Sequence, residues 1–321
     1  MTTSRSLIAS GAKRLSRGPH PERARQDAEA LLLQVLGKGR AWLIAHAGEA
    51  LAEDKASRYL ALIERRFQGE PMQYITGEAE FYRLPFRVTR DVLIPRPETE
   101  LLVERVTQLA PLFLPQSDRF FVFRKTVPHT WREPATAVNA NKTESGTNKT
   151  SHGPRILDVG TGSGAIAISI AHDWQQAEIT AIDISPAALE IARGNAEQLG
   201  CADNIRFLEG SLLEPVVNEN FEIIVANPPY VATTDRDSLS VEVRDYEPGL
   251  ALFAGEDGLA IYRRLIPAAF AQLVSGGFLL LEIGYGQEQA IRGLLAGAGF
   301  KGIEFVSDLQ QIPRVACAWK P

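Results

Sequence analysis

The stretch "ILDVGTGSGAIAI" (residues 156–168) decides the fold, because it passes from a strand through a glycine loop into a helix. Its first residues are mainly apolar, as in a buried strand, and the small and apolar residues from Ala165 onward predict a helix. Gly160, Gly162 and Gly164 allow a tight turn and let a ligand approach the backbone closely. This order of elements indicates a parallel α/β sheet with a ligand site at the loop.

The chain around this stretch alternates between apolar strands and helical segments. Helical patterns cover 186–199 and 258–274, and they separate strands that read as buried on both faces. The last two strands, 303–306 and 314–319, have too short a link for a parallel crossover, so we expect an antiparallel hairpin. The seven expected strands are "RILDV" (155–159), "EITAID" (178–183), "IRFLE" (205–209), "FEIIVAN" (221–227), "GFLLLEI" (277–283), "IEFV" (303–306) and "RVACAW" (314–319). We therefore predict a doubly wound, Rossmann-like α/β sheet that closes with a hairpin.

The N-terminal part of the chain predicts a small helical domain. Residues 24–36 carry apolar side chains at helical spacing and end at Gly37. A second helix is expected over 53–67, with Tyr59, Leu60, Ile63 and Phe67 on one buried stripe.

Residues 74–94 then change to the alternating pattern of a β-hairpin. We predict a helical domain over 1–72, a hairpin linker over 73–97 and a catalytic domain over 98–321. Within the last, residues 115–153 form an insertion whose Asn-, Thr- and Ser-rich second half predicts disorder.

Composition limits the class of protein. A hydrophobic content of 45% provides a buried core, and no apolar run approaches the roughly 18 residues of a membrane span. The net charge of −5 argues against a protein that binds nucleic acid over its whole surface. Cys201 and Cys317 suggest neither a disulfide framework nor a zinc site. We expect a cytoplasmic monomer without a metal.

The Arg- and Ser-rich start of the chain leaves two interpretations. Arg5, Lys13, Arg14 and Arg17 stand in an acid-poor segment, which is compatible with a transit peptide. We favour a first amphipathic helix with a basic face.

The ligand of the glycine loop has two candidates at the level of the motif. Gly160, Gly162 and Ala165 satisfy the dinucleotide fingerprint, and Asp183 ends the next strand, where it can accept both ribose hydroxyls of either ligand. Asp158 precedes the glycines, and a carboxylate there suits a cationic ligand better than a pyrophosphate. S-adenosylmethionine carries a sulfonium and an ammonium but no phosphate. We therefore predict S-adenosylmethionine, held by the loop that includes Thr161 and Ser163.

The stretch "VANPPYV" (225–231) ends the fourth strand with residues that suit methyl transfer to an amide nitrogen. Such a nitrogen is a poor nucleophile, because its lone pair is delocalised. Acceptors placed for its N–H groups in the transition state accelerate the reaction. The Asn227 oxygen and the Pro228 carbonyl can be these acceptors, Pro229 stiffens the backbone, and Tyr230 can cover the planar group.

These stretches together resemble a known family. The protein-(glutamine-N5) methyltransferases of peptide chain release factors are similar to nearly the whole chain outside 115–153. The resemblance is carried by "RQDAEALLLQVLG" (25–37), "EPMQYITGEAEFY" (70–82), "LIPRPETELLVE" (93–104), "ILDVGTGSGAIAI" (156–168), "VANPPYV" (225–231) and "EVRDYEPGLALFAGEDGL" (242–259).

The resemblance implies methylation of the glutamine in the Gly-Gly-Gln motif of release factors. It assigns Gly160 to Gly164 to the methionine and ribose of the donor, Asp183 to the ribose, and Asn227 to Tyr230 to the glutamine amide. The sequence departs from the family at Ser211 and Leu212, where an acidic-aromatic pair near the adenine is common.

Two other hypotheses remain at this stage. An N6-adenine or N4-cytosine methyltransferase of DNA or RNA uses the same Asn-Pro-Pro-Tyr acceptors on a flipped base. The acidic balance of the chain argues against it. A non-catalytic S-adenosylmethionine-binding or ribosome-associated protein is the third hypothesis, and the intact Asn227 argues against that one.

Overall fold

The computed structural model describes residues 3–113 and 153–321. Apart from Gly153, the predicted insertion 115–153 lies outside these residues. The chain forms two compact units, one of Met1–Glu78, Val88–Arg90 and Asp237–Glu247, the other of Ala79–Arg87, Asp91–Arg236 and Pro248–Pro321.

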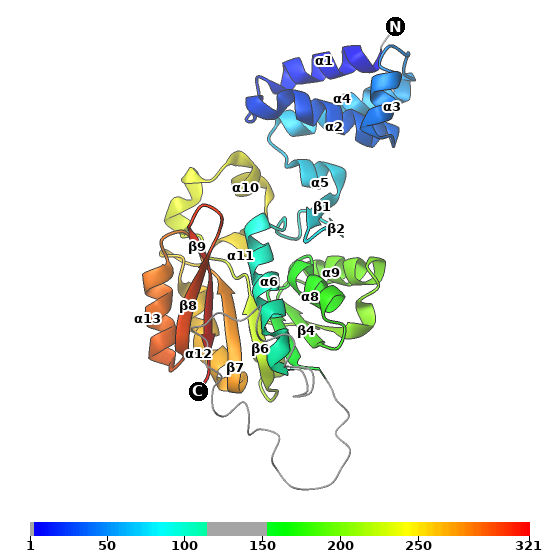
Figure 1. The fold of residues 1–321 in the computed structure, drawn as a ribbon. Coiled ribbons are helices and arrows are strands. Elements are labelled where there is room, and N and C mark those ends of the chain that lie inside the picture. Colours follow the sequence, from blue (N-terminus) through cyan, green and yellow to red (C-terminus); the bar gives the residue numbers. More distant parts are fainter. Residues whose placement is uncertain (1–2, 114–152) are drawn as a thin grey trace. The chain divides into compact units, whose positions relative to one another are not determined.

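The first unit is helical, as predicted for the N-terminal region. The side chains of α1, α2 and α4 pack into one apolar core, and these helices lie side by side in Figure 1. Thr3 caps α1 by accepting the Ser6 backbone N–H, and the Ser6 hydroxyl accepts the Thr3 backbone N–H in return. The helices are α1 Ser4–Leu15, α2 Ala24–Leu36, α3 Arg40–Ala45, α4 Glu53–Phe67, α5 Met72–Thr76 and α10 Val241–Tyr246.

Two expectations for this unit need correction. Leu60 is 50% exposed, and the buried positions of α4 are Tyr59, Ile63 and Arg66. The strand pattern expected from residue 74 begins at Glu78, because α5 occupies the residues before it and ends at Gly77 in the left-handed conformation, with a φ of 80°.

The buried Arg66 explains why residues 237–247 belong to this unit. Its Nε donates to Asp27 Oδ2 at 2.7 Å, and its Nη1 donates to the Glu242 carboxylate and to the Glu70 carbonyl. Tyr246 in the same segment donates to the Gln68 carbonyl at 3.1 Å. The stretch that follows the Asn-Pro-Pro-Tyr motif is thus part of the helical unit, which the sequence pattern did not reveal.

The second unit contains the predicted seven-stranded sheet and a two-stranded hairpin, β1–β2. The sheet has the order β5-β4-β3-β6-β7-β9-β8; its first five strands are parallel, and β9 is antiparallel to both β7 and β8. The predicted closing hairpin is therefore confirmed. The strands are β1 Glu78–Phe81, β2 Leu84–Arg87, β3 Arg155–Val159, β4 Glu178–Asp183, β5 Ile205–Glu209, β6 Phe221–Ala226, β7 Leu273–Glu282, β8 Lys301–Ser307 and β9 Pro313–Trp319.

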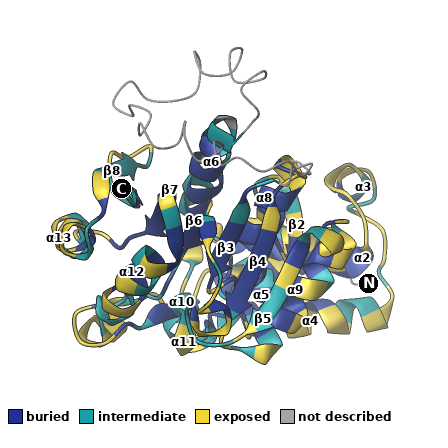
Figure 2. Cartoon of the chain, turned by 90° about the horizontal axis from the view of Figure 1, so that it is seen from below, coloured by how far each residue is buried: buried dark blue, intermediate teal, exposed yellow. Residues whose placement is uncertain are grey.

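Helices cover both faces of this sheet, so its central strands are buried while the outer faces of the helices are exposed (Figure 2). Alternate strand residues serve the two cores: Ile156, Ile223 and Leu280 contact one, and Leu157, Ile224 and Leu281 contact the other. The helices are α6 Glu100–Leu109, α8 Ala165–Asp173, α9 Pro186–Gln198, α11 Gly249–Leu252, α12 Ala260–Gln272 and α13 Glu288–Ala298.

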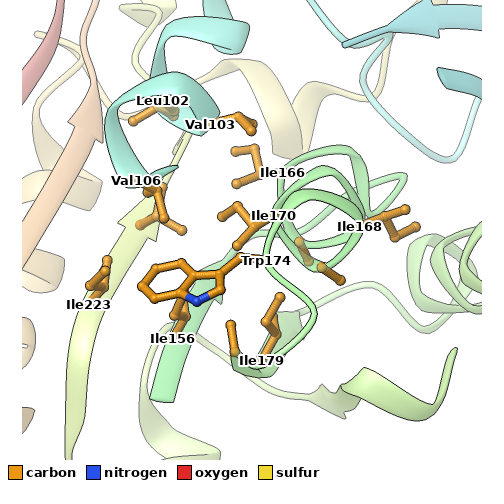
Figure 3. Close-up of a cluster of buried hydrophobic side chains, with 14 of the residues drawn as sticks. Leu102, Val103, Val106, Ile156, Ile166, Ile168, Ile170, Trp174, Ile179 and Ile223 are labelled. Carbon is orange, nitrogen blue, oxygen red and sulfur yellow. The ribbon is translucent and has the colours of Figure 1, made fainter. Parts of the chain in front are cut away.

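Helix α6 is anchored firmly to the first of these cores. Leu102, Val103 and Val106 of α6 share this core with Ile166 and Ile170 of α8, and Trp174 lies next to Ile156 of the sheet (Figure 3). This packing fixes the N-terminal end of α6 over the sheet, where the 3₁₀ turn η2 (Pro97–Thr99) leads into the helix.

Candidate active site

The two predicted motifs meet at the point where the strand order reverses. The chain runs outward from β3 through β4 to β5, and then returns to β6 on the other side of β3. Ligands of open α/β sheets bind at the carboxyl ends of the strands at such a switch point. Val159 pairs with Ala226 in the β3–β6 register, so Gly160 and Asn227 are the next residues of two neighbouring strands. The glycine loop and the Asn-Pro-Pro-Tyr motif thus leave the sheet at the same edge.

The glycine loop has the backbone that its sequence predicts. Gly160, Gly162 and Gly164 have φ values of 77°, 56° and 82°, in the left-handed region that favours glycine. A Cβ on Gly164 would lie 2.7 Å from the Ile168 side chain, so this glycine also permits close packing at the start of α8. Apart from the two chain neighbours of each glycine, no described residue has an atom within 4 Å of a Cβ built on Gly160 or Gly162, which leaves that side of the loop open to a ligand.

Asp183 ties the glycine loop to the neighbouring strand. Its Oδ2 accepts the Gly162 backbone N–H at 2.8 Å, and its Oδ1 accepts the Ser185 backbone N–H at 2.9 Å. Burial raises the pKa of Asp183, and these two backbone donors oppose the shift. Each carboxylate oxygen can accept a second hydrogen bond, so Asp183 keeps the capacity to hold two ribose hydroxyls.

Asp158 lies buried beneath the same loop. Thr161 donates its hydroxyl to Asp158 Oδ2 at 2.7 Å. The other oxygen, Oδ1, is buried and has no hydrogen-bond partner among the described residues. Burial raises the pKa of Asp158 to about 7. The Thr161 hydroxyl and the Ala167 backbone N–H oppose this shift, so the carboxylate lies close to donors of the loop and of the first turn of α8.

Asn227 of the Asn-Pro-Pro-Tyr motif lies next to Glu282, an acid that the sequence analysis missed. Ala226 pairs with Leu281 in the β6–β7 register, so Asn227 and Glu282 follow at adjacent positions. Strand alternation puts both on the face that α6 covers, because Val225 and Leu280 belong to that core.

Thr99 at the start of α6 links these two side chains. Its Oγ1 lies 2.6 Å from Glu282 Oε2 and 3.0 Å from Asn227 Nδ2. The Thr99 hydroxyl has one hydrogen, which it donates to the ionised carboxylate, so its oxygen accepts from the Asn227 amide. With Nδ2 committed in this way, Asn227 Oδ1 is the atom left to accept from a substrate.

Glu282 is fully enclosed by this network and by two tyrosines. Tyr230 donates its hydroxyl to Glu282 Oε1 at 3.3 Å, and Tyr262 donates to the Glu282 backbone carbonyl at 2.6 Å. Burial raises the pKa of Glu282 to about 7, although the Thr99 and Tyr230 hydroxyls favour the ionised form. The carboxylate is held entirely by protein donors.

The backbone of Tyr230 is also fixed. Gln287 donates its side-chain amide to the Tyr230 carbonyl at 3.0 Å, and its own oxygen accepts the Gly284 N–H at 2.9 Å. A Cβ on Gly258 would lie 2.3 Å from the Tyr230 carbonyl oxygen, so only glycine fits there. The following Val231 exchanges backbone hydrogen bonds with Leu252 and Ala254. The motif is therefore held on both sides.

The structure brings together the predicted loop, Asp183 and the Asn-Pro-Pro-Tyr motif at one edge of the sheet. Within the motif Pro228 is buried, while Asn227, Pro229 and Tyr230 remain partly accessible. Sequence reasoning missed the supporting residues Thr99, Glu282, Tyr262 and Gln287. One signal was available for Glu282, since it is a lone acid at the end of an otherwise apolar strand.

The sequence departs from the family at Ser211 and Leu212, which follow β5, the edge strand beside β4. Leu212 has a φ of 52°, and the Ser211 hydroxyl accepts from Arg264 at 3.2 Å.

Two family models match the chain. The PrmC N-terminal domain matches residues 6–77, and the methyltransferase small domain matches residues 145–243. Their combined span includes most of the helical unit, the glycine loop and the Asn-Pro-Pro-Tyr motif.

Proteins named release factor glutamine methyltransferase are similar over nearly the whole chain. The one from Koribacter versatilis is 38% identical over 298 residues, which cover 92% of this chain and 91% of that protein. The one from Bradyrhizobium diazoefficiens is 39% identical over 300 residues, which cover 93% of this chain and 89% of that protein.

A solved structure shares the fold at low sequence identity. The hMettl16 catalytic domain, solved in complex with the MAT2A 3′UTR hairpin 6, has a TM-score of 0.50 and 17% identity. It covers 84% of this chain, and this chain matches 82% of it. The likeness shows a methyltransferase fold and nothing about the substrate.

Proposed function

The chain belongs to the release factor glutamine methyltransferase family, and we propose that it methylates the Gly-Gly-Gln glutamine of peptide chain release factors on its side-chain nitrogen, N5. The methyl donor of this proposal is S-adenosylmethionine. The observation that carries it is the Asn227 amide, whose Nδ2 is committed to Thr99 and whose Oδ1 is left as an acceptor at the edge that holds the glycine loop.

The residues of the glycine loop fit the donor. The buried Asp158 carboxylate beneath the loop supplies a negative charge that suits a cationic ligand, and the spare acceptor capacity of Asp183 suits the ribose hydroxyls. The open side of Gly160 and Gly162 leaves room for a ligand against the backbone. When bound, S-adenosylmethionine supplies an electrophilic methyl group on a sulfonium. Thr161, Ser163 and Gly164 complete the proposed loop.

The residues of the Asn-Pro-Pro-Tyr motif act on the acceptor. Asn227 Oδ1 and the Pro228 carbonyl accept the two N–H groups of the glutamine amide, and they suit the pyramidal nitrogen of the transition state better than the planar ground state. Tyr230 covers the face of the amide, and Pro229 keeps the backbone rigid. Positioning of the nitrogen in line with the methyl group is the main contribution to the rate.

We also propose that the chain divides into a helical domain over 1–72, a linker over 73–97 and a catalytic domain over 98–321. The proposed protein is a cytoplasmic monomer. No helix within the ranges 3–113 and 153–321 is long and apolar enough to cross a membrane. The nucleic-acid alternative is not favoured, since the similar full-length proteins carry the release-factor name.

The experiment that tests the proposed function is transfer of a labelled methyl group to a panel of release factors. We expect label on the wild-type factor and none on a factor whose Gly-Gly-Gln is changed to Gly-Gly-Glu, because the carboxylate has no N–H groups to donate. Duplex and single-stranded DNA serve as competing substrates. Label on DNA with none on any release factor would contradict the proposal.

A further inference from the structure

Methyl transfer by this route depends on which end of the Asn227 amide faces the substrate. The two ends of the amide have nearly the same shape but opposite hydrogen-bonding character. If Oδ1 faces the glutamine nitrogen, it accepts an N–H; if Nδ2 does, two donors oppose each other. Asn227 itself does not decide between these orientations, so a neighbouring group has to.

Resting on the proposed function, we propose that Thr99 and Glu282 are positioning residues: the ionised Glu282 carboxylate, through the Thr99 hydroxyl, holds Asn227 with Oδ1 toward the acceptor nitrogen. The direction of each hydrogen bond follows from its neighbour. The carboxylate only accepts, so Thr99 donates to it at 2.6 Å. Thr99 then has only its oxygen left for Asn227, and it accepts from Nδ2 at 3.0 Å.

The parts of this network are held by separate elements. Asn227 follows β6, Glu282 ends β7, and Thr99 ends the turn that leads into α6. Thr99 and Glu282 are 4% and 2% exposed, so water cannot readily replace either partner. The network is therefore fixed before substrate arrives, as a preorganised site requires.

The orientation depends on the charge of Glu282. The groups that face it are Tyr230 and Tyr262, with Glu98 raising its pKa and Arg314 lowering it, and burial has the largest effect, which raises the pKa to about 7. A protonated Glu282 donates its own hydrogen to Thr99 Oγ1. The Thr99 hydrogen is then free to turn toward Asn227, and the amide loses its defined direction. The competent orientation is thus favoured above pH 7.

Three variants test the role of these residues. Thr99→Val keeps the shape but removes both hydrogen bonds, Thr99→Ser keeps the hydroxyl, and Glu282→Gln replaces an acceptor by a group that also donates. We expect Thr99→Val and Glu282→Gln to lower kcat about tenfold to a hundredfold, on the scale of a misplaced reacting group. Thr99→Ser should retain most of the wild-type rate. Calorimetric affinity for S-adenosylmethionine should stay close to wild type in all three, and each should unfold in one cooperative transition, which separates misplacement from misfolding.

The pH profile supplies a readout that a merely structural role would not change. The wild-type kcat should rise with pH through about 7, the pKa of Glu282. In Glu282→Gln the profile should lose this rise, because the variant has no carboxyl group to ionise. A Thr99→Val variant with wild-type kcat, or an unchanged profile in Glu282→Gln, would overturn the proposal.

A measurement without any release factor separates this inference from the proposed function. In protein labelled with ¹⁵N-asparagine, the Asn227 side-chain NH₂ signal is identified by its loss in Asn227→Asp. It should titrate near pH 7 in the wild type and stop titrating in Glu282→Gln. If it does so while no release factor is methylated, the proposed function fails and the positioning network stands. If methylation proceeds and the signal does not titrate, the network is contradicted.

Discussion

Two buried carboxylates, Asp158 and Glu282, lie on the same face of the sheet, and their differences divide the site into two halves. Each accepts a threonine hydroxyl, from Thr161 at 2.7 Å and from Thr99 at 2.6 Å. Burial raises the pKa of each to about 7. Asp158 has an oxygen without a partner among the described residues, whereas both oxygens of Glu282 accept from protein hydroxyls.

The comparison teaches that similar burial serves different purposes. Asp158 lies buried beneath the glycine loop and accepts the Thr161 hydroxyl, so we assign it to the half of the site proposed to bind the methyl donor, called the donor half below. Both oxygens of Glu282 accept from protein hydroxyls, and it acts on Asn227 through Thr99, so we assign it to the half proposed to bind the glutamine, called the acceptor half below. Variants in the donor half should mainly change the affinity for S-adenosylmethionine, and variants in the acceptor half should mainly change turnover.

The largest expected effect is on the acceptor half. Asn227→Ala should lower turnover about 10²- to 10³-fold, because the lost acceptor acts where the transition state differs from the ground state. Its affinity for S-adenosylmethionine should remain near that of the wild type. Single-turnover methylation measures the turnover, and calorimetry measures the affinity. A comparable loss in both would contradict the division of the site into two halves.

Asp158→Asn should have the opposite pattern, with weaker binding of S-adenosylmethionine as its main effect. It removes the buried negative charge beneath the glycine loop, which we expect to cost about 1.5–3 kcal/mol, or roughly a tenfold to hundredfold weaker affinity for S-adenosylmethionine. Glu282→Gln is the matched control, since it neutralises an equally buried acid in the other half. Equal losses of affinity in the two variants would contradict the assignment.

Binding of S-adenosylmethionine should be coupled to the ionisation of Asp158. Binding of a cation lowers the pKa of Asp158 from about 7, so binding near neutral pH should release a proton. Affinity should rise with pH until Asp158 is ionised. Calorimetry in buffers of different ionisation enthalpy detects this proton, which should be absent from Asp158→Asn and present in Glu282→Gln.

Asp183→Ala should weaken binding of S-adenosylmethionine at least about tenfold, on the scale of two charge-assisted hydrogen bonds. The loss has a second source, because Asp183 also holds the Gly162 and Ser185 N–H groups. Asp183→Asn keeps an acceptor for one of these groups and should lose less. Unchanged affinity in Asp183→Ala would remove this residue from the donor half.

The last expected effect is on the pH dependence of the free energy of unfolding. Both carboxyl groups have a pKa of about 7 in the folded chain, above their value in the unfolded chain, so the folded state binds more protons between these values. Their contribution to stability is complete at acidic pH and is lost as pH rises through 7. Each should lower the free energy of unfolding by about 3–4 kcal/mol as pH rises from about 4 to 7. Urea unfolding of Asp158→Asn and Glu282→Gln should show a shallower pH dependence than the wild type.

The donor half could be predicted from sequence because it is local. Asp158, the glycines and Thr161 lie within one short stretch, and Asp183 ends the next strand, so spacing alone brings them together. The sheet followed for the same reason, since its strands are apolar runs with clear boundaries.

The support of the acceptor half could not be predicted in this way. Thr99 and Glu282 are 183 residues apart in the chain, and only the β6–β7 register and the packing of α6 place them beside Asn227. The helical unit shows the same limit. Leu60 was expected in the core but is exposed, whereas Arg66 is buried beside the predicted Tyr59 and Ile63. The partners of Arg66, Asp27 and Glu242, come from distant segments. Patterns of hydrophobicity do not reveal buried charges with remote partners.

The most direct test of the account is a double-mutant cycle between Asn227→Ala and Glu282→Gln, read as single-turnover methylation of a Gly-Gly-Gln release factor at pH 8. If Glu282 acts only through Asn227, removing it has no further effect once the Asn227 amide is absent. We predict that the double variant is as slow as Asn227→Ala alone. A double variant slowed by the product of the two single effects would show that Glu282 acts independently and would contradict the account.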